Sequence, residues 1–244
     1  MPRPAKKTRI DLLMVELGLA ESQQQAQALL MAGDVTVDGR LVDKAGVLVS
    51  PSARVEVKTP PPYVGRGGIK LAHALQTFGL KVEGTAALDV GASTGGFTDC
   101  LLQHGAARVY AVDVGYGQLH MRLRQDPRVV VMERVNARYP FQLPEAVDLA
   151  TVDVSFISLV KVLPSMAKQL KSGGQIIALA KPQFEALRRQ VGKGGVVRDP
   201  AIHAEVLARL IVWATHHRFR LRGVTPSPLL GDAGNREFFI LLET

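Results

Sequence analysis

Four ionisable residues stand where predicted secondary-structure elements begin or end. Asp153 and Lys181 each directly follow a short apolar segment that reads as a buried strand. Lys70 lies at the start of a predicted helix, and Glu237 lies in the last predicted strand. Open α/β sheets place their sites at the carboxyl ends of their strands, so the sequence predicts that these side chains meet there.

Two lysines and two carboxylates could hold a hydroxyl group and accept its proton. A lysine beside a second cation loses basicity, burial lowers its pKa further, and lysines tuned in this way reach pKa values of roughly 7–8. A carboxylate partner opposes that shift but fixes the position of the amine. Taken singly, a lysine at a strand end is usually solvated and an aspartate there is usually a cap. Only the complete set predicts proton-transfer chemistry.

A glycine-rich turn follows the apolar strand predicted at residues 85–90 and opens a helix. Such a turn lets backbone N–H groups approach a ligand closely at a helix N-terminus. Asp113 ends the next predicted strand, where a carboxylate can bind ribose hydroxyls. The turn therefore predicts a site for a nucleotide-type cofactor. The candidate cofactor contacts are Asp89, Gly91, Ser93, Thr94, Gly95, Gly96, Phe97, Asp113 and Asn136.

Two cofactor classes fit this pattern. A dinucleotide would place its pyrophosphate on the turn, usually with the spacing G-x-G-x-x-G, and Asp89 would repel that phosphate. S-adenosylmethionine has no phosphate, and its ammonium and sulfonium groups are compatible with a nearby carboxylate. The acid therefore favours S-adenosylmethionine over the dinucleotide. Asn136 is a candidate adenine contact, although an asparagine in a turn often only shapes the turn.

Strands and helices alternate through the larger part of the chain. This alternation predicts an α/β domain with a mostly parallel, Rossmann-like sheet covered on both faces, spanning residues 68–244. The predicted helices are 69–78, 96–104, 160–171 and 200–216. The predicted strands are 85–90, 108–113, 129–134, 149–154, 174–180, 219–226 and 236–242.

The first 59 residues predict a separate, small α+β domain. Apolar residues recur at helical spacing from Ile10 to Leu17, and Ser22 opens a second helix that stops at Gly33. Asp38–Gly39 is a strong hairpin signal between short strands. Consecutive prolines favour an extended backbone, so residues 60–67 are expected to form a linker.

Composition and charge narrow the class of protein. The chain of 244 residues is 47% hydrophobic, and its formal net charge of +8 suits a polyanionic partner. Residues 61–244 carry most of this surplus, with 22 Lys/Arg against 15 Asp/Glu. Apolar runs have only strand length, and the basic N-terminus leads into no apolar segment, so a cytoplasmic protein is expected. Cys100 stands alone and the histidines lack ligand spacing, so no metal is expected.

The N-terminal pattern resembles the αL-type RNA-binding domain first described in a ribosomal protein. In such domains the helix pair and hairpin present basic side chains to structured RNA; docking to a protein is the alternative role. Family members usually carry a basic residue after the serine, whereas Gln23 stands here. The candidate RNA contacts of this domain are Lys6, Lys7, Arg9, Arg40 and Lys44. The residues that carry the resemblance are Thr8, Ser22, Ala26, Leu30, Gly33, Val35, Val37, Gly39, Val42 and Val57.

The remaining motifs resemble the FtsJ-type ribose 2′-O-methyltransferases, and more narrowly the TlyA family, which joins both domain types. Members of that family are often labelled haemolysins. Gly65 departs from the pattern, in which a serine is expected. Besides the four ionisable residues and the glycine-rich turn, the motifs are STGGFTD at 93–99, DVGYGQL at 113–119, DVSFIS at 153–158, KPQFE at 181–185, GKGGVVRD at 192–199 and GNRE at 234–237.

The resemblance implies an S-adenosylmethionine-dependent enzyme that methylates a cytidine 2′-hydroxyl in ribosomal RNA, acting as a monomer on ribosomal subunits. It implies a catalytic set of Lys70, Asp153, Lys181 and Glu237, in which we interpret Lys181 as the central base or the group that positions the hydroxyl. The linker and the loop from Pro182 to Pro200 add candidate RNA contacts, although a solvated loop is the alternative for the latter. These candidates are Arg66, Arg188, Arg189, Lys193 and Arg198.

Two other classes of function remain open at this point. A non-catalytic ribosome-assembly factor could keep the cofactor fold, but the complete set of ionisable residues argues against it. A membrane-active haemolysin would need a spanning or basic amphipathic segment, and none is visible in the sequence.

Overall fold

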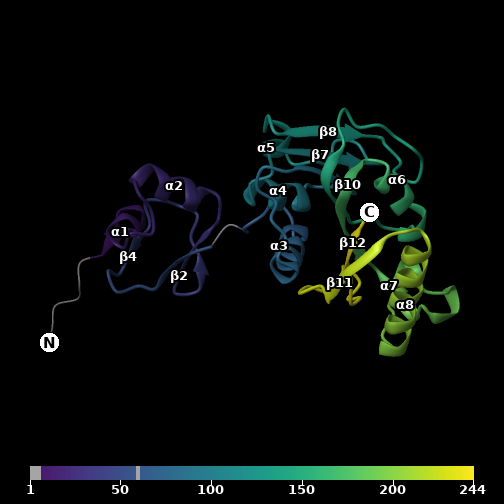
Figure 1. Ribbon diagram of the computed structural model, residues 1–244. Helices are drawn as coiled ribbons and strands as arrows, with labels where there is room; N and C mark the ends of the chain where they lie inside the picture. The colour runs from purple at the N-terminus through teal and green to yellow at the C-terminus, as the bar shows by residue number, and fades with distance from the viewer. Residues whose placement is uncertain (1–6, 59–60) are drawn as a thin grey trace. The chain divides into compact units, whose positions relative to one another are not determined.

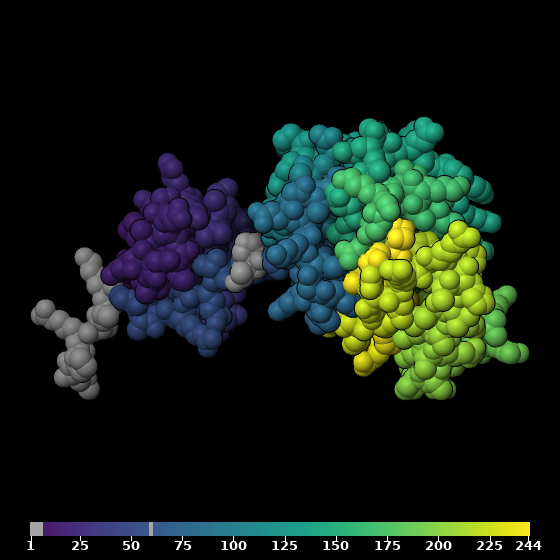
Figure 2. All heavy atoms as spheres, in the orientation of Figure 1, coloured from purple at the N-terminus to yellow at the C-terminus, as the bar shows by residue number. Residues whose placement is uncertain are grey.

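The fold is taken from a computed structural model, which describes residues 7–58 and 61–244. The chain divides into two compact units, residues 1–61 and 62–244, and each unit is treated by itself (Figures 1 and 2). Residues 62–67, expected to belong to a linker, therefore lie in the second unit. Within that unit, Val64 N–H donates to the Asp99 side chain at 2.8 Å.

The N-terminal unit packs two helices against short antiparallel strands, as the sequence predicts. Its core contains Ile10, Leu13 and Leu30, all nearly inaccessible to solvent. The β1–β4 pair escaped prediction because two-residue strands carry no periodicity. The elements are β1 (Thr8–Arg9), α1 (Ile10–Glu16), α2 (Gln23–Met31), β2 (Val35–Val37), β3 (Arg40–Leu41), β4 (Leu48–Val49) and β5 (Val55–Val57), with sheets β1-β4 and β3-β2-β5.

Local sequence signals set the turns of this unit. The Ser22 hydroxyl accepts a hydrogen bond from Gln25 N–H at 3.2 Å and caps α2. Asp38 and Gly39 both have left-handed backbone conformations, with φ of 50° and 76°, between β2 and β3. A two-residue hairpin turn of this kind requires positive φ at both positions, which explains the Asp-Gly pair.

The second unit is built on a seven-stranded sheet in the order β11-β12-β10-β9-β6-β7-β8. All neighbours pair in parallel except β12, which runs antiparallel to both β10 and β11. The chain starts at β6, continues to β7 and β8 on one side, and then crosses to β9 on the other. A crevice for ligands is expected at such a switch point, between β6 and β9. The strands are β6 (Ala86–Val90), β7 (Arg108–Asp113), β8 (Val129–Glu133), β9 (Val147–Val152), β10 (Leu170–Ala180), β11 (Arg220–Pro226) and β12 (Phe238–Glu243).

Helices cover both faces of this sheet (Figure 1). One apolar core lies between the sheet and the helices on each face. On β6, Leu88 and Val90 enter one core and Ala87 enters the other, as alternating side chains require. The predicted α/β fold is therefore confirmed. The helices are α3 (Gly67–Phe78), α4 (Gly96–Gln103), α5 (Met121–Arg124), α6 (Leu163–Ala167), α7 (Pro182–Glu185) and α8 (Pro200–His216), and short 3₁₀ turns are Leu159–Lys161, Arg188–Gln190 and Lys193–Gly195.

One predicted helix is wrong in extent. Residues 160–171 were expected to form a continuous helix, but they contain the 3₁₀ turn, the short α6 and the beginning of β10. Pro164 stands in the first turn of α6, and it has no N–H to continue a helix that began before it. Because α6 is short, β10 begins at Leu170 rather than near residue 174.

Candidate active site

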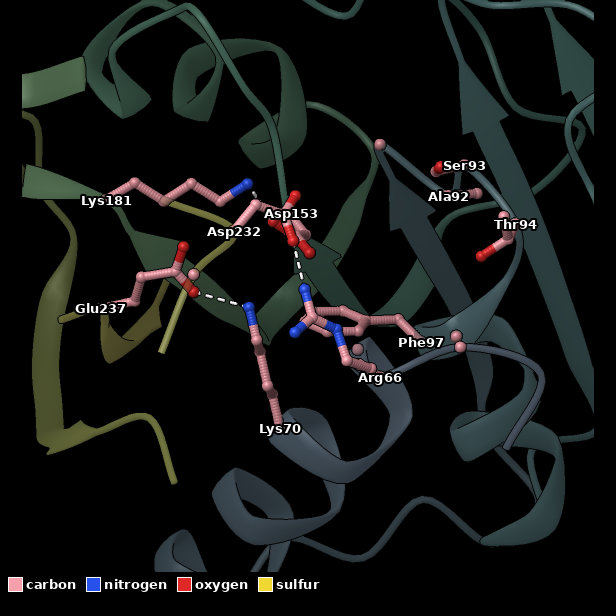
Figure 3. Close-up of a pocket in the computed structure, with 15 residues that line it drawn as sticks. Arg66, Lys70, Ala92, Ser93, Thr94, Phe97, Asp153, Lys181, Asp232 and Glu237 are labelled. Atoms are coloured by element: carbon pink, nitrogen blue, oxygen red, sulfur yellow. Dashed lines mark hydrogen bonds and ion pairs between the residues drawn. The ribbon is translucent and has the colours of Figure 1, made fainter. Parts of the chain in front are cut away.

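Two adjoining cavities lie at the carboxyl ends of the central strands. They share Gly91, Ser93 and Asp153 as lining residues. The first cavity contains all four predicted catalytic side chains, and Figure 3 shows it with the residues that line it. The second, of about 460 Å³, is lined by Asp113 and Asn136 among others. A volume of this order is typical of cofactor sites.

Lys70 and Glu237 form one of two ion pairs in the first cavity. Lys70 Nζ lies 2.7 Å from Glu237 Oε2, and the two side chains are 11% and 3% exposed. Helix α3 presents Lys70, whereas Glu237 directly precedes β12 instead of lying within it. Each side chain neutralises the other, because a buried charge is costly without a partner.

Lys181 and Asp153 form the second ion pair, with Nζ 2.7 Å from Oδ1 (Figure 3). The angles of this contact are not those of a hydrogen bond, and Oδ1 has no hydrogen-bond partner among the described residues. Lys181 donates instead to the Ser155 hydroxyl, at 2.9 Å. The Asp153 Oδ1 atom is therefore held by the charge of the Lys181 ammonium rather than by a hydrogen bond.

The glycine-rich turn allows a close approach of two chain segments at the cavity floor. Gly91 has a φ of 82°, and a side chain there would collide with the Asp153 carbonyl. Gly95 has a φ of 98° and caps α4; a side chain there would meet Leu119 and Leu123. These are positions that only glycine occupies without strain.

Asp113 ties the ends of β6 and β7 together at the second cavity. Its carboxylate accepts hydrogen bonds from Ser93 N–H at 2.8 Å and from Gly115 N–H at 2.7 Å. Asn136 lines the same cavity, and its side-chain oxygen accepts from Arg138 N–H at 3.1 Å. Asn136 is therefore a turn former as well as a cavity residue.

Comparisons with known proteins agree with this geometry. The model of the FtsJ-like methyltransferase family matches residues 63–244, and the S4 domain model matches residues 8–55. The chain belongs to the FtsJ-like methyltransferase family. The family predicted from the sequence motifs is thereby confirmed.

Relatives resemble the chain over almost its whole length. It is 46% identical to the 16S/23S rRNA (cytidine-2′-O)-methyltransferase TlyA of Mycobacterium tuberculosis, over 98% of this chain and 91% of that protein. It is 40% identical to Hemolysin A of Brachyspira hyodysenteriae, over 94% and 97%. A solved structure from Streptococcus thermophilus, also titled a hemolysin, superposes with a TM-score of 0.74 at 45% identity, over 98% of this chain and 89% of that one. Among the residues described here, no helix has the length and apolar character needed to cross a bilayer.

Most predicted cofactor contacts of the FtsJ-like domain line a cavity, but two do not. Asp89 and Gly95 line neither cavity, so their expected contact with the cofactor stays a prediction that the cavities do not support. Asp89 is fully buried and accepts hydrogen bonds from Thr98 and Thr151 hydroxyls at 2.7 and 3.0 Å. The Asp89 carboxylate therefore links β6 to α4 and to β9 on either side of the glycine-rich turn. The predicted contacts that do line a cavity are Gly91, Ser93, Thr94, Gly96, Phe97, Asp113 and Asn136.

Burial raises the pKa of Asp89 to about 7, against the opposing effect of the two threonine hydroxyls. Between an unfolded pKa of about 4 and this folded value, the unfolded chain loses a proton that the folded protein keeps. The free energy of unfolding should therefore fall, relative to that of Asp89→Asn, as pH rises from 4 to 7. Urea unfolding of both proteins at pH 4.5 and 7.5 measures this difference. If the difference in unfolding free energy between the two proteins stayed constant with pH, the raised pKa of Asp89 would be contradicted.

Three residues of the site were missed by sequence reasoning. Ser155 contacts Lys181, and Phe156 lines the second cavity with 90% of its surface exposed and a φ of 62°. Both lie in the motif 153–158, which was recognised but assigned no role beyond Asp153. Asp232 forms an ion pair with Arg66 across the first cavity, between exposed side chains (Figure 3).

The basic residues predicted to bind RNA divide into engaged and free groups. In the S4 domain, Arg9 pairs with the buried Asp11 at 2.7 Å, and Gln23 and Gln27 donate to the same carboxylate. The Arg9 guanidinium, with these two amides, holds the pKa of Asp11 well below its ordinary value. Lys6 lies outside the described residues. The free group consists of exposed side chains that form no salt bridge with any described residue. Its members are Lys7, Arg40, Lys44, Arg188, Arg189, Lys193 and Arg198.

Asn235 orders the basic loop that follows α7. Its buried side chain donates to the Gly195 carbonyl and accepts from Val197 N–H, both at 2.9 Å. The same residue stands two positions before Glu237. The loop that carries Lys193 is therefore anchored to the segment that enters β12.

Proposed function

We propose that this protein transfers a methyl group from S-adenosylmethionine to the 2′-hydroxyl of a cytidine in ribosomal RNA. One observation carries the proposal: two lysine–carboxylate pairs face one cavity, which adjoins a second cavity of nucleotide-binding character. This pairing suits deprotonation of a hydroxyl. The names of curated relatives agree with the reaction and the substrate class.

The residues present fit S-adenosylmethionine as the cofactor. Asp113 stands at the tip of β7, where a carboxylate can accept hydrogen bonds from ribose hydroxyls, and Asn136 is available to an adenine. Asp153 lies beside the turn, lines both cavities and pairs with Lys181. When bound, S-adenosylmethionine supplies an electrophilic methyl group on its sulfonium.

The four ionisable residues would divide the remaining work. Lys181 would accept the proton of the ribose hydroxyl as the methyl group is transferred, and Asp153 holds that amine in place. Lys70 would donate a hydrogen bond to the oxygen of that hydroxyl. Glu237 holds Lys70 in position and balances its charge. Correct alignment of the hydroxyl accounts for much of the acceleration expected of such a site.

The RNA partner is supported by the S4 domain and by the free basic side chains. Phosphate contacts position a substrate without reading its sequence, which suits the exposed lysines and arginines of both units. The Gln23 side chain carries no charge, and its amide donates a hydrogen bond to Asp11. The start of α2 is therefore less basic than the family pattern implies. Ribosomal RNA as substrate places the protein in the cytoplasm, where we expect a monomer to act on assembled subunits.

Transfer of tritium from labelled S-adenosylmethionine to separated ribosomal subunits lacking the modification tests the proposal. The wild-type protein should label the RNA of at least one subunit, and purified subunit proteins should stay unlabelled. Cofactor binding without label on any RNA would replace the proposal with a non-catalytic assembly factor. Lysis of erythrocytes that survives Lys181→Ala would separate the hemolysin name from methyl transfer.

A further inference from the structure

Glu185 is a partly buried carboxylate that the proposed chemistry does not use. It is the last residue of α7, four positions after Lys181. Its Oε2 accepts a hydrogen bond from the Ser158 hydroxyl at 2.6 Å, and its Oε1 accepts from Leu159 N–H at 2.7 Å. Both partners belong to the segment that follows Asp153 along the chain.

We propose that Glu185 is a positioning residue, which clamps the segment 153–159 onto the turn that carries Lys181. The inference rests on the proposed function, because the two segments joined in this way carry Asp153 and Lys181. Among the described residues, Glu185 itself forms no hydrogen bond or ion pair with Asp153 or Lys181 through its side chain.

Lys181 and Glu185 belong to one hydrogen-bonded turn. Phe184 N–H donates to the Lys181 carbonyl at 2.9 Å, and Ala186 N–H donates to the Pro182 carbonyl at 2.8 Å. The turn is held from outside as well, because the Arg209 guanidinium of α8 donates to the Glu185 carbonyl at 2.8 Å. A displacement of Glu185 therefore also displaces the backbone of Lys181.

The segment 153–159 is attached to this turn at both of its ends. At the first end, Lys181 pairs with Asp153 and donates to Ser155. At the other end, Glu185 accepts from Ser158 and Leu159. The β9–β10 ladder sets the distance between the strand ends, with Val152 beside Ala178, and the two contacts at each end hold the segment that follows β9 against the turn that follows β10. The Lys181–Asp153 geometry therefore depends on the Glu185 contacts.

Backbone strain between the two attachments supports a clamp. Phe156 lies midway in the segment and has a left-handed conformation with a φ of 62°. A bulky residue keeps such a conformation only where surrounding contacts over-determine it. The Phe156 ring packs on the ring of Phe184, the neighbour of Glu185, with centroids 5.0 Å apart. Phe156 is otherwise exposed, so this ring contact joins it to the turn that carries Glu185.

Charge explains why a carboxylate is used at this position. Burial raises the pKa of Glu185, whereas the bonds from Ser158 and Leu159 and the nearby Arg209 lower it. Hydrogen bonds to an ionised acceptor are short and strong, and one carboxylate can accept two at once. An apolar residue of similar size would fill the space without joining the two segments.

Three variants of the full-length protein test the clamp. Glu185→Ala removes both acceptors, and Glu185→Gln keeps an acceptor oxygen. Asp148→Ala is the matched control. Asp148 also accepts a hydrogen bond from a backbone N–H, that of Ala86 at 3.0 Å, and it pairs with Lys171 near the amino ends of β9 and β10, at the opposite ends of these strands from the cavities. The measurements are kcat with both substrates saturating and hydrogen exchange of the peptide that covers residues 153–160.

Glu185→Ala should lower kcat by about 10- to 100-fold and speed exchange in residues 153–160. Glu185→Gln can accept from Leu159 N–H and donate to the Ser158 hydroxyl, so it should recover part of the rate, and Asp148→Ala should change neither quantity. Unchanged kcat or unchanged exchange in Glu185→Ala would overturn the positioning role, as would a Gln variant as slow as the Ala variant. A wild-type protein that methylates no RNA would refute the proposed function instead, and the exchange measurement would still decide whether the clamp exists.

Discussion

Lys181→Ala is expected to lower kcat for methyl transfer by about 10²- to 10⁴-fold, the range typical of a lost general base. The amine that accepts the hydroxyl proton is removed, while the second cavity, which Lys181 does not line, stays intact. Binding of S-adenosylmethionine should therefore remain close to that of the wild-type protein. Single-turnover transfer and equilibrium dialysis of the labelled cofactor measure the two quantities separately.

A second variant separates proton acceptance from charge. Lys181→Arg keeps a cation beside Asp153 but cannot give up its proton at ordinary pH, so it should be nearly as slow as Lys181→Ala. Lys171→Ala is the matched control, because Lys171 is a lysine of β10 that pairs with Asp148 of β9 at 2.7 Å, away from the cavities. An arginine variant with near wild-type kcat would show that Lys181 acts only through its charge.

Glu237→Ala is expected to destabilise the second unit by about 3–5 kcal/mol, the cost of breaking a buried ion pair. The substitution leaves the ammonium of Lys70 buried without its carboxylate partner at 2.7 Å. Urea unfolding followed by the fluorescence of Trp213, the single tryptophan, reports on this unit. Activity should be lost together with stability, because Lys70 loses its fixed position.

A double variant distinguishes the structural from the catalytic role of this pair. Two well-packed apolar residues often replace a buried ion pair without loss of stability. Lys70→Met with Glu237→Leu should therefore recover most of the stability lost in Glu237→Ala, but no methyl transfer. Recovery of activity with stability would mean that the pair only supports the fold.

The sheet was predictable because most of its buried strands are short apolar runs, and several of these runs end in or directly precede a polar residue. Asp153 and Lys181 follow such runs directly, so their meeting at one edge follows from parallel pairing alone. Lys70 and Glu237 were expected at the same site, but their pairing with each other was not predicted, because the contact joins residues 167 positions apart. Periodicity along the chain carries no information on such a distant pair.

The features that the sequence did not predict have equally local causes. Pro164 sits inside an apolar pattern of helical period, and that pattern concealed the break before α6. Asp89 precedes a glycine-rich turn as a ligand residue would, but its strand turns the side chain inward toward Thr98 and Thr151. The partners of Ser155 and Asp232 depend on the paths of irregular loops. Propensity and spacing do not predict those paths.

The structure gives a physical reason for Gln23, which stands where the family pattern has a basic residue. Its amide donates to Asp11 at 2.9 Å, beside the pair formed by Arg9. Glutamine at this position therefore satisfies a buried carboxylate in the S4 domain without adding a charge to its surface. The free lysines and arginine of that domain, Lys7, Arg40 and Lys44, remain its candidates for phosphate contacts.

The position of the transferred methyl group tests the central proposal most directly. Ribosomal RNA from subunits treated with the wild-type protein would be digested to nucleosides and separated by liquid chromatography with mass detection, beside RNA treated with Lys181→Ala. We predict one new product, 2′-O-methylcytidine, which is absent from the Lys181→Ala sample. A methyl group on the cytosine base, or a 2′-O-methyl product that persists without Lys181, would contradict the assignment of a hydroxyl-deprotonating site.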